Sequence, residues 1–169
     1  LASVLRDQEH AEQLLNKEKR SVSVEARAKL ADEVIDGMVS RNAENPEAYL
    51  ARYRYRNQYR LPGAESDLEA ALKHGPEHLG TLLVAAAHAR REAERSEGGR
   101  GPADRTRVQY EKARDLYTRA IKVAFADGRA YLGLGEVHMA LGQMDRAVEV
   151  WRQALAQVDK ESIDLNLRL

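Results

Sequence analysis

The chain has 169 residues, with 27 Lys and Arg against 27 Asp and Glu, so its formal net charge is zero and no overall field draws it to nucleic acid or to an anionic membrane. It contains no Cys, which excludes disulfides, thiol catalysis and cysteine-ligated metals. No apolar run approaches the roughly 20 residues of a membrane-spanning helix, so no membrane role is expected.

Helically spaced apolar residues recur along almost the whole chain, whereas nothing of useful length alternates like a strand. The helices predicted from this spacing cover residues 2–18, 22–41, 46–60, 64–74, 77–95, 106–124, 128–141 and 144–158. Pro46 and Pro76 each stand near the first turn of a predicted helix, where the fixed φ and missing N–H of proline fit. Residues 96–105, SEGGRGPADR, form the longest break, and their composition predicts a mobile, Gly-rich polar loop. The fold class is therefore predicted to be all-α.

Residues 49–60, YLARYRYRNQYR, combine four tyrosines with four arginines. Single-stranded nucleic acid sites use such residues, because aromatic rings stack on bases and guanidinium groups meet phosphates. Tyrosine and arginine are also enriched where protein interfaces bind most strongly. The structural alternative is that the tyrosines pack between helices while the arginine stems cover apolar surface. Nucleic acid is the least favoured of the three, because acidic residues flank the stretch and interrupt any basic stripe. These acids are Glu44, Glu47, Glu65, Asp67 and Glu69.

An internal repeat is the strongest signal in the sequence. A small, large, small pattern, with spacings of four and three residues, occurs three times. Its copies are Ala64, Leu68 and Ala71, then Ala113, Tyr117 and Ala120, and finally Ala147, Trp151 and Ala154. The last two copies are 34 residues apart and the first two are 49 apart, which leaves an excess of 15. That excess is about the size of the stretch around residues 96–105, which we therefore predict to be an insertion between the two helices of one repeat.

The last repeat, YLGLGEVHMALGQMDRAVEVWRQAL at residues 131–155, resembles the tetratricopeptide repeat (TPR) family. Tyr131, Leu134 and Gly135 stand where the family has its aromatic residue, Leu and Gly, and the third copy of the small, large, small pattern follows on the second helix. The resemblance implies a right-handed α-solenoid of antiparallel helix pairs, about four in number. A repeat motif of this kind indicates a fold but gives almost no information about function.

The predicted division of the chain follows from these repeats. It consists of a degenerate N-terminal helix pair at 1–45, TPR-like repeats at 46–76, 77–127 (with the inserted loop 96–105) and 128–159, and residues 160–169 as a C-terminal tail or the start of a truncated next repeat. Because the chain starts at Leu1 and ends on this apolar tail, we expect it to be a piece of a larger bacterial-type TPR protein. Both a cytoplasmic and a periplasmic location are compatible with the sequence.

The resemblance also implies where a partner would bind. In this family the first helix of each pair lines a concave groove, which generally binds peptides or protein segments. The groove residues that this predicts are Leu50, Arg54, Asn57, Gln58, Leu83, Ala87, Arg90, Leu132, Glu136 and Met139. Arg54, Asn57 and Gln58 are the polar anchors that we expect to matter most.

Catalytic and metal-binding patterns are missing from the sequence. His74 and His78 have the four-residue spacing of helical metal ligands, but Gly75 and Pro76 between them are expected to break the helix. No P-loop, GxGxxG or GxSxG motif occurs, so no cofactor and no enzymatic activity are expected. The predicted function is a non-catalytic scaffold for a partner peptide or protein. The alternatives are an RNA-associated helical repeat using residues 49–60, and self-association through the C-terminal end.

Overall fold

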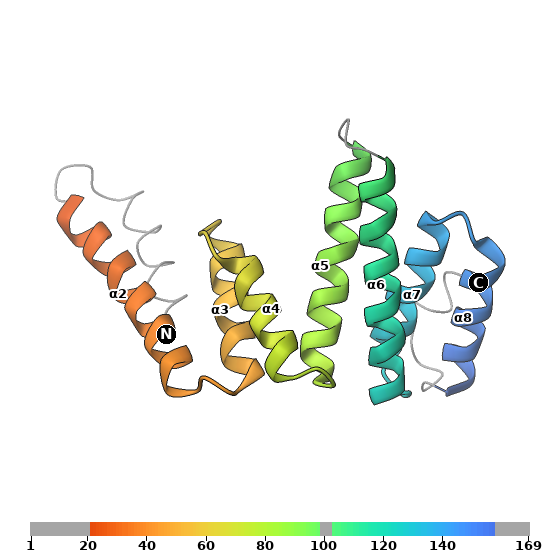
Figure 1. The fold of residues 1–169 in the computed structure, drawn as a ribbon, viewed down its shortest axis with the longest axis horizontal. Helices are drawn as coiled ribbons and strands as arrows, with labels where there is room; N and C mark the ends of the chain where they lie inside the picture. Colours follow the sequence, from red (N-terminus) through yellow and green to blue (C-terminus); the bar gives the residue numbers. More distant parts are fainter. Residues whose placement is uncertain (1–20, 99–102, 158–169) are drawn as a thin grey trace. The chain divides into compact units, whose positions relative to one another are not determined.

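The computed structural model describes residues 21–98 and 103–157, and every regular element in these ranges is an α-helix. The helices are α2 (Ser21–Arg41), α3 (Pro46–Gln58), α4 (Ala64–His74), α5 (Leu79–Gly98), α6 (Ala103–Val123), α7 (Gly128–Ala140) and α8 (Met144–Gln157) (Figure 1). The all-α prediction is confirmed, and each of these helices overlaps one that the sequence predicted. The helix predicted at residues 2–18 and the tail 160–169 lie outside the described residues.

Two compact units divide the chain between Gly75 and Pro76. In the first unit α3 packs against α2 and α4. In the second unit α5 packs against α6, α6 against α7 and α7 against α8, and α5 also contacts α7. Packing of each helix against its neighbours along the chain is how a helical repeat buries its apolar faces. The repeat boundaries drawn from the sequence remain a prediction.

Local capping groups fix where several helices begin. Asn45 caps α3 by accepting a hydrogen bond from the Glu47 backbone N–H at 3.0 Å, with Pro46 in the first turn as the sequence predicted. The helix expected from residue 77 instead begins at Leu79, because the Nδ1 atom of His78 accepts from the Thr81 backbone N–H at 3.2 Å. That bond gives the first turn of α5 a side-chain cap that the Gly-Pro pair could not supply.

Residues on both sides of 99–102 extend two helices instead of belonging to a ten-residue loop. The helices α5 and α6 have 20 and 21 residues, against 13 and 14 for α7 and α8. Residues 96–98 and 103–105 are therefore helical, and the loop predicted at 96–105 is wrong at both ends; residues 99–102 lie outside the described ranges. The helix-forming run of Glu, Ala and Arg before Gly98 explains the extension, as does the bond that the Ser96 hydroxyl donates to the Glu92 carbonyl at 2.9 Å. In Figure 1 the two long helices project past the ends of α7.

The residues of the repeated pattern are almost all buried. Of its nine members all are buried except Ala64, which is half-buried. On α7, aromatic rings pack directly against the helix backbone at two glycines. A Cβ added at Gly133 would lie 2.2 Å from the Tyr117 ring, and one added at Gly135 would lie 2.0 Å from the Trp151 indole. Side chains of any size at these two positions would push α6 and α8 away from α7.

Candidate functional site

Two arginines of the tyrosine- and arginine-rich helix α3 tie three helices together. Arg52 contacts Asp36 on α2 at 2.9 Å and Asp67 on α4 at 2.6 Å. Arg56, one turn later, contacts the same two carboxylates at 3.1 and 2.9 Å. The Asp67 side chain is only 2% exposed, so its charge depends on these two guanidinium groups for compensation. Neither arginine is therefore available to meet a phosphate without breaking this cluster.

Burial and neighbouring carboxylates have opposite effects on the pKa of Arg52. Burial by itself lowers the pKa of Arg52, but hydrogen bonds and charges from Asp67 and then Asp36 outweigh it and raise that pKa above its ordinary value. The group therefore stays charged at any pH at which the protein folds. A permanently charged guanidinium with a planar set of donors suits a bridge between two carboxylates. We interpret this cluster as structural, because it holds α2, α3 and α4 together.

The tyrosines of the same helix are used in packing. Tyr53 and Tyr55 are buried, and the Tyr55 hydroxyl donates to the Asp32 carboxylate at 2.6 Å. The Tyr49 ring stacks on His74 with 5.2 Å between centroids, and Tyr59 meets Tyr55 edge to face. Base stacking needs exposed ring faces, so this arrangement gives the RNA-associated alternative no support. The packing interpretation of residues 49–60 accounts for these contacts.

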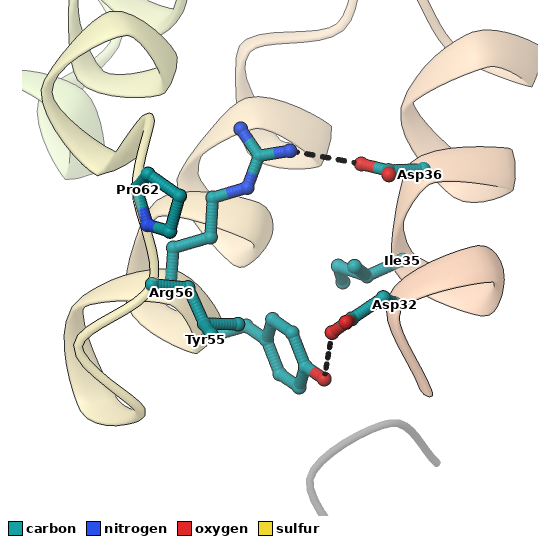
Figure 2. A pocket seen from close by; sticks show the side chains of 7 residues that line it. Asp32, Ile35, Asp36, Tyr55, Arg56 and Pro62 are labelled. Atoms are coloured by element: carbon teal, nitrogen blue, oxygen red, sulfur yellow. Dashed lines mark hydrogen bonds and ion pairs between the residues drawn. The ribbon is translucent and has the colours of Figure 1, made fainter. Parts of the chain in front are cut away.

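A small cavity lies beside this cluster in the first unit (Figure 2). Its volume is about 160 Å³, and it is lined by Asp32, Ile35, Asp36, Tyr55, Arg56, Leu61 and Pro62. Figure 2 shows Arg56 directed toward Asp36, and the Tyr55 hydroxyl directed toward Asp32. Pockets for cofactors and drug-sized ligands have volumes of about 300–1,000 Å³, so this one has room for a few waters or a very small ligand. Its polar groups already bind one another.

The predicted groove residues on α3 fall into two groups. Arg54, Asn57 and Gln58 are exposed, as contact residues must be. Leu50 is 0% exposed, so its assignment to a partner-binding surface is wrong. Full burial of a leucine side chain is favourable by about 1.5–3 kcal/mol, and Leu50 shares its helix face with the buried Tyr53.

Two of the predicted rows come together in the second unit. Leu83, Ala87 and Arg90 follow one face of α5, and Leu132, Glu136 and Met139 follow one face of α7, at spacings of three or four residues. An ion pair links Arg90, at the end of the α5 row, to Glu136, in the middle of the α7 row. All six residues are at least partly accessible, and Met139 is 42% exposed. We call these six residues the α5/α7 face.

Asp36 and Asp67 are the site residues that sequence reasoning missed. Asp67 directly precedes Leu68, on the buried face of α4, and a charged residue on an apolar face signals a buried partner. Asp36 directly follows the buried Ile35 but is itself half-exposed, and nothing in its local sequence points to Arg52 or Arg56. Its role follows only from the way in which α2 packs on α3.

Comparison with known proteins places the fold. No protein-family model matches the chain, and no curated protein matches it. Among solved structures, the crystal structure of a thermophilic TPR protein from Thermus thermophilus matches with a TM-score of 0.60 and 20% sequence identity, over 93% of this chain and 74% of that one. The fold is TPR-like.

Within 21–98 and 103–157, no three His, Asp or Glu side chains gather in a way that would hold a metal ion. None of the helices in these ranges is long and apolar enough to cross a membrane.

Proposed function

We propose that the chain is a non-catalytic scaffold that binds a segment of a partner protein along the α5/α7 face. The observation that supports this most directly is the Arg90–Glu136 ion pair, which joins the two predicted rows into one surface. Because these two charges neutralise each other, the apolar side chains around them set the chemistry of the face. Leu83, Ala87 and Leu132 are half-buried and Met139 is exposed, so the preferred ligand is an apolar segment.

The way in which the helices are held also favours such binding. The α5/α7 face sits on two helices that are packed against α6 and α8, so it needs no ordering when a partner arrives. A preformed surface loses little conformational entropy on binding, and the partner segment supplies most of that cost. Exposed Arg54, Asn57 and Gln58 on α3 are proposed as polar contacts for the same kind of partner.

A site-specific cross-linking experiment tests the proposal. A photoreactive amino acid is placed at Ala87 or Met139 of the α5/α7 face, and at exposed Arg152 on α8 as the control. Irradiation in source-cell lysate, with and without nuclease, is followed by mass spectrometry. We expect Ala87 and Met139 to cross-link to the same protein with or without nuclease, and Arg152 to give no such product. Equal products at all three positions, or products that nuclease removes, would contradict the proposal.

A charge-swap pair separates binding from structure. Arg90→Glu alone places two carboxylates together and is expected to weaken both partner binding and helix packing. The double variant Arg90→Glu with Glu136→Arg restores opposite charges and is expected to recover thermal stability. If binding recovers together with stability, the ion pair positions the face; if binding stays lost while stability recovers, the partner contacts one of the two charges directly.

A further inference from the structure

One side of the last helix pair carries a stripe of apolar residues. On each helix its members are three or four residues apart, so they share one face of that helix. The two rows meet where the Trp151 indole packs against the α7 backbone at Gly135. These two residues are buried, and the other members are half-buried or exposed, with Met139 at 42% and Met144 at 56%. We call this set the α7/α8 stripe; it consists of Leu132, Gly135 and Met139 on α7, and of Met144, Val148, Trp151 and Leu155 on α8.

The α7/α8 stripe lies on the side of α7 that faces away from α6. The Tyr117 ring of α6 packs against Gly133, which is two residues before Gly135. Two residues correspond to about 200° around an α-helix, so Tyr117 and Trp151 lie on nearly opposite sides of α7. Among the described helices, only α7 packs extensively against α8. Within residues 103–157, the α8 half of the stripe therefore has no helix packed over it.

The residues that follow α8 have a matching apolar pattern. Residues 158–169 read VDKESIDLNLRL, and the apolar side chains in this segment stand at every second position. A helix would divide such residues between its opposite sides, whereas an extended chain places all of them on one side. The pattern is too short to predict a sheet, but it provides one continuous apolar edge. This edge consists of Ile163, Leu165, Leu167 and Leu169.

We propose that residues 163–169 lie in extended form along the α7/α8 stripe of the same chain. The lengths agree, because these residues span about 20 Å when extended and the α8 row from Met144 to Leu155 is about 17 Å long. Residues 158–162 remain for the reversal of direction, and a tight turn needs only four residues. The covalent link holds the segment at a high effective concentration beside the stripe, so contacts too weak to hold a free peptide are sufficient.

Other occupants fit the stripe less well. No member of the stripe is charged, so it offers nothing specific to a phosphate of nucleic acid or of an anionic lipid. A second copy of the chain could offer the same apolar segment, but it would lose translational and rotational freedom on association. The segment of the same chain has no such loss. The apolar edge that follows α8 directly is therefore the occupant that these observations favour.

Docking of this segment would regulate the proposed partner-binding face. Leu132 and Met139 belong both to the α7/α8 stripe and to the α5/α7 face, so the segment and a partner compete for them. A partner then binds only the fraction of molecules in which the segment is displaced, and its apparent affinity falls by that fraction. This consequence rests on the proposed function, whereas docking of the segment does not.

Methionine oxidation in the 169-residue chain tests the docking without any partner. The chain has three methionines, of which Met139 and Met144 lie in the stripe and Met38 lies on α2. Limiting hydrogen peroxide converts accessible thioethers to sulfoxides, and mass spectrometry gives the rate at each methionine. Met38 serves as the internal reference.

Two double variants separate the apolar edge from added charge. Leu165→Asp with Leu167→Asp disrupts the apolar edge. Ser162→Asp with Asn166→Asp adds the same charge at positions outside that edge and is the matched control. Circular dichroism establishes that each variant keeps its helix content.

We expect Met139 and Met144 to oxidise at least about threefold faster in the Leu165→Asp, Leu167→Asp variant than in the wild type, which corresponds to a segment docked for about two thirds of the time. The control variant should oxidise at the rates of the wild type, and Met38 should not change in any protein. Equal rates in all three proteins, or an equal acceleration in the control, would overturn the proposal. Protection that disappears on dilution of the wild type would also overturn it, because the occupant would then be a second copy.

The cross-linking experiment separates this proposal from the proposed function. With the photoreactive residue at Ala87, the Leu165→Asp, Leu167→Asp variant should give more cross-linked partner than the wild type. Protected methionines without a cross-linked partner in either protein would contradict the binding face alone. Unprotected methionines with a cross-linked partner would contradict the docking alone.

Discussion

Replacing Gly135 with alanine is a stringent test of the packing between α7 and α8. The added Cβ would lie 2.0 Å from Nε1, 2.3 Å from Cε2 and 2.7 Å from Cδ1 of the Trp151 indole. Non-bonded carbon atoms prefer separations of about 3.5–4.0 Å, so the ring or the whole of α8 has to move by roughly 1.5 Å. Trp151 is held in a buried cluster with Tyr131, Ala147 and Ala154, which leaves it no space to turn aside.

Two opposing effects set the size of the change. Overpacking a well-packed core costs about 1–3 kcal/mol, and replacing glycine by alanine inside a helix contributes about 0.5–1 kcal/mol of stability. We therefore expect Gly135→Ala to lower the free energy of unfolding by about 1–2 kcal/mol. Gly37→Ala in α2 is the matched control, because its added Cβ meets only the flexible end of Arg41, at 3.4 Å. That variant should be more stable than the wild type by about 0.5–1 kcal/mol.

Urea unfolding at 25 °C measures both variants. Trp151 is the one tryptophan in the sequence, so its fluorescence reports on this part of the chain while circular dichroism reports on all helices. The predicted shifts in the urea midpoint have opposite signs. A Gly135→Ala protein that is as stable as Gly37→Ala, with unchanged tryptophan emission, would show that the indole does not lie against α7.

Two further variants test the charged groups. Asp67→Ala leaves Arg52 and Arg56 without their buried partner and should lower the free energy of unfolding by about 3 kcal/mol, measured by urea unfolding at pH 7. A loss below about 0.5 kcal/mol would mean that these ion pairs do not stabilise the packing of α2, α3 and α4. At the start of α7, hydrogen bonds from Arg129 lower the pKa of Asp127 despite its partial burial. The stability that this carboxylate contributes is therefore fully present above the ordinary aspartate pKa of about 3.9. It is lost as the pH falls through the lower pKa of the folded state. Asp127→Asn keeps a capping side chain but loses the ion pair with Arg129, so it should be less stable than the wild type by about 0.5–1 kcal/mol at pH 7. Thermal melts should show this difference in stability disappearing below about pH 3.9. A difference that does not depend on pH would contradict this prediction.

The sequence predicts the helices well because their signals are local. Apolar spacing and the pair Asn45–Pro46 each act within a few residues, and the described helices begin and end close to where these signals place them. The loop predicted at residues 96–105 is wrong at both ends, because the prediction followed its glycines. The helix formers on both sides instead extend α5 and α6 into that stretch.

The site was less predictable because it depends on contacts between distant segments. The pairing of Arg52 and Arg56 with Asp36 and Asp67 needs three helices in place, and a single-helix pattern cannot show it. The burial of Leu50 likewise depends on what packs over its face of α3. The partner-binding role of the α5/α7 face remains a prediction, which rests on helical spacing, accessibility and one ion pair.

Binding of a protein segment by the α5/α7 face can be tested at one exposed side chain, Met139. The most direct test is the affinity of the cross-linked partner segment, as a purified peptide, for Met139→Glu and Val123→Glu. These two exposed apolar residues are 42% and 43% accessible, but Val123 ends α6 and lies outside the face. We expect Met139→Glu to weaken binding about tenfold, or about 1.4 kcal/mol, and Val123→Glu to leave Kd within about twofold of the wild type. Equal affinities for the two variants would contradict it.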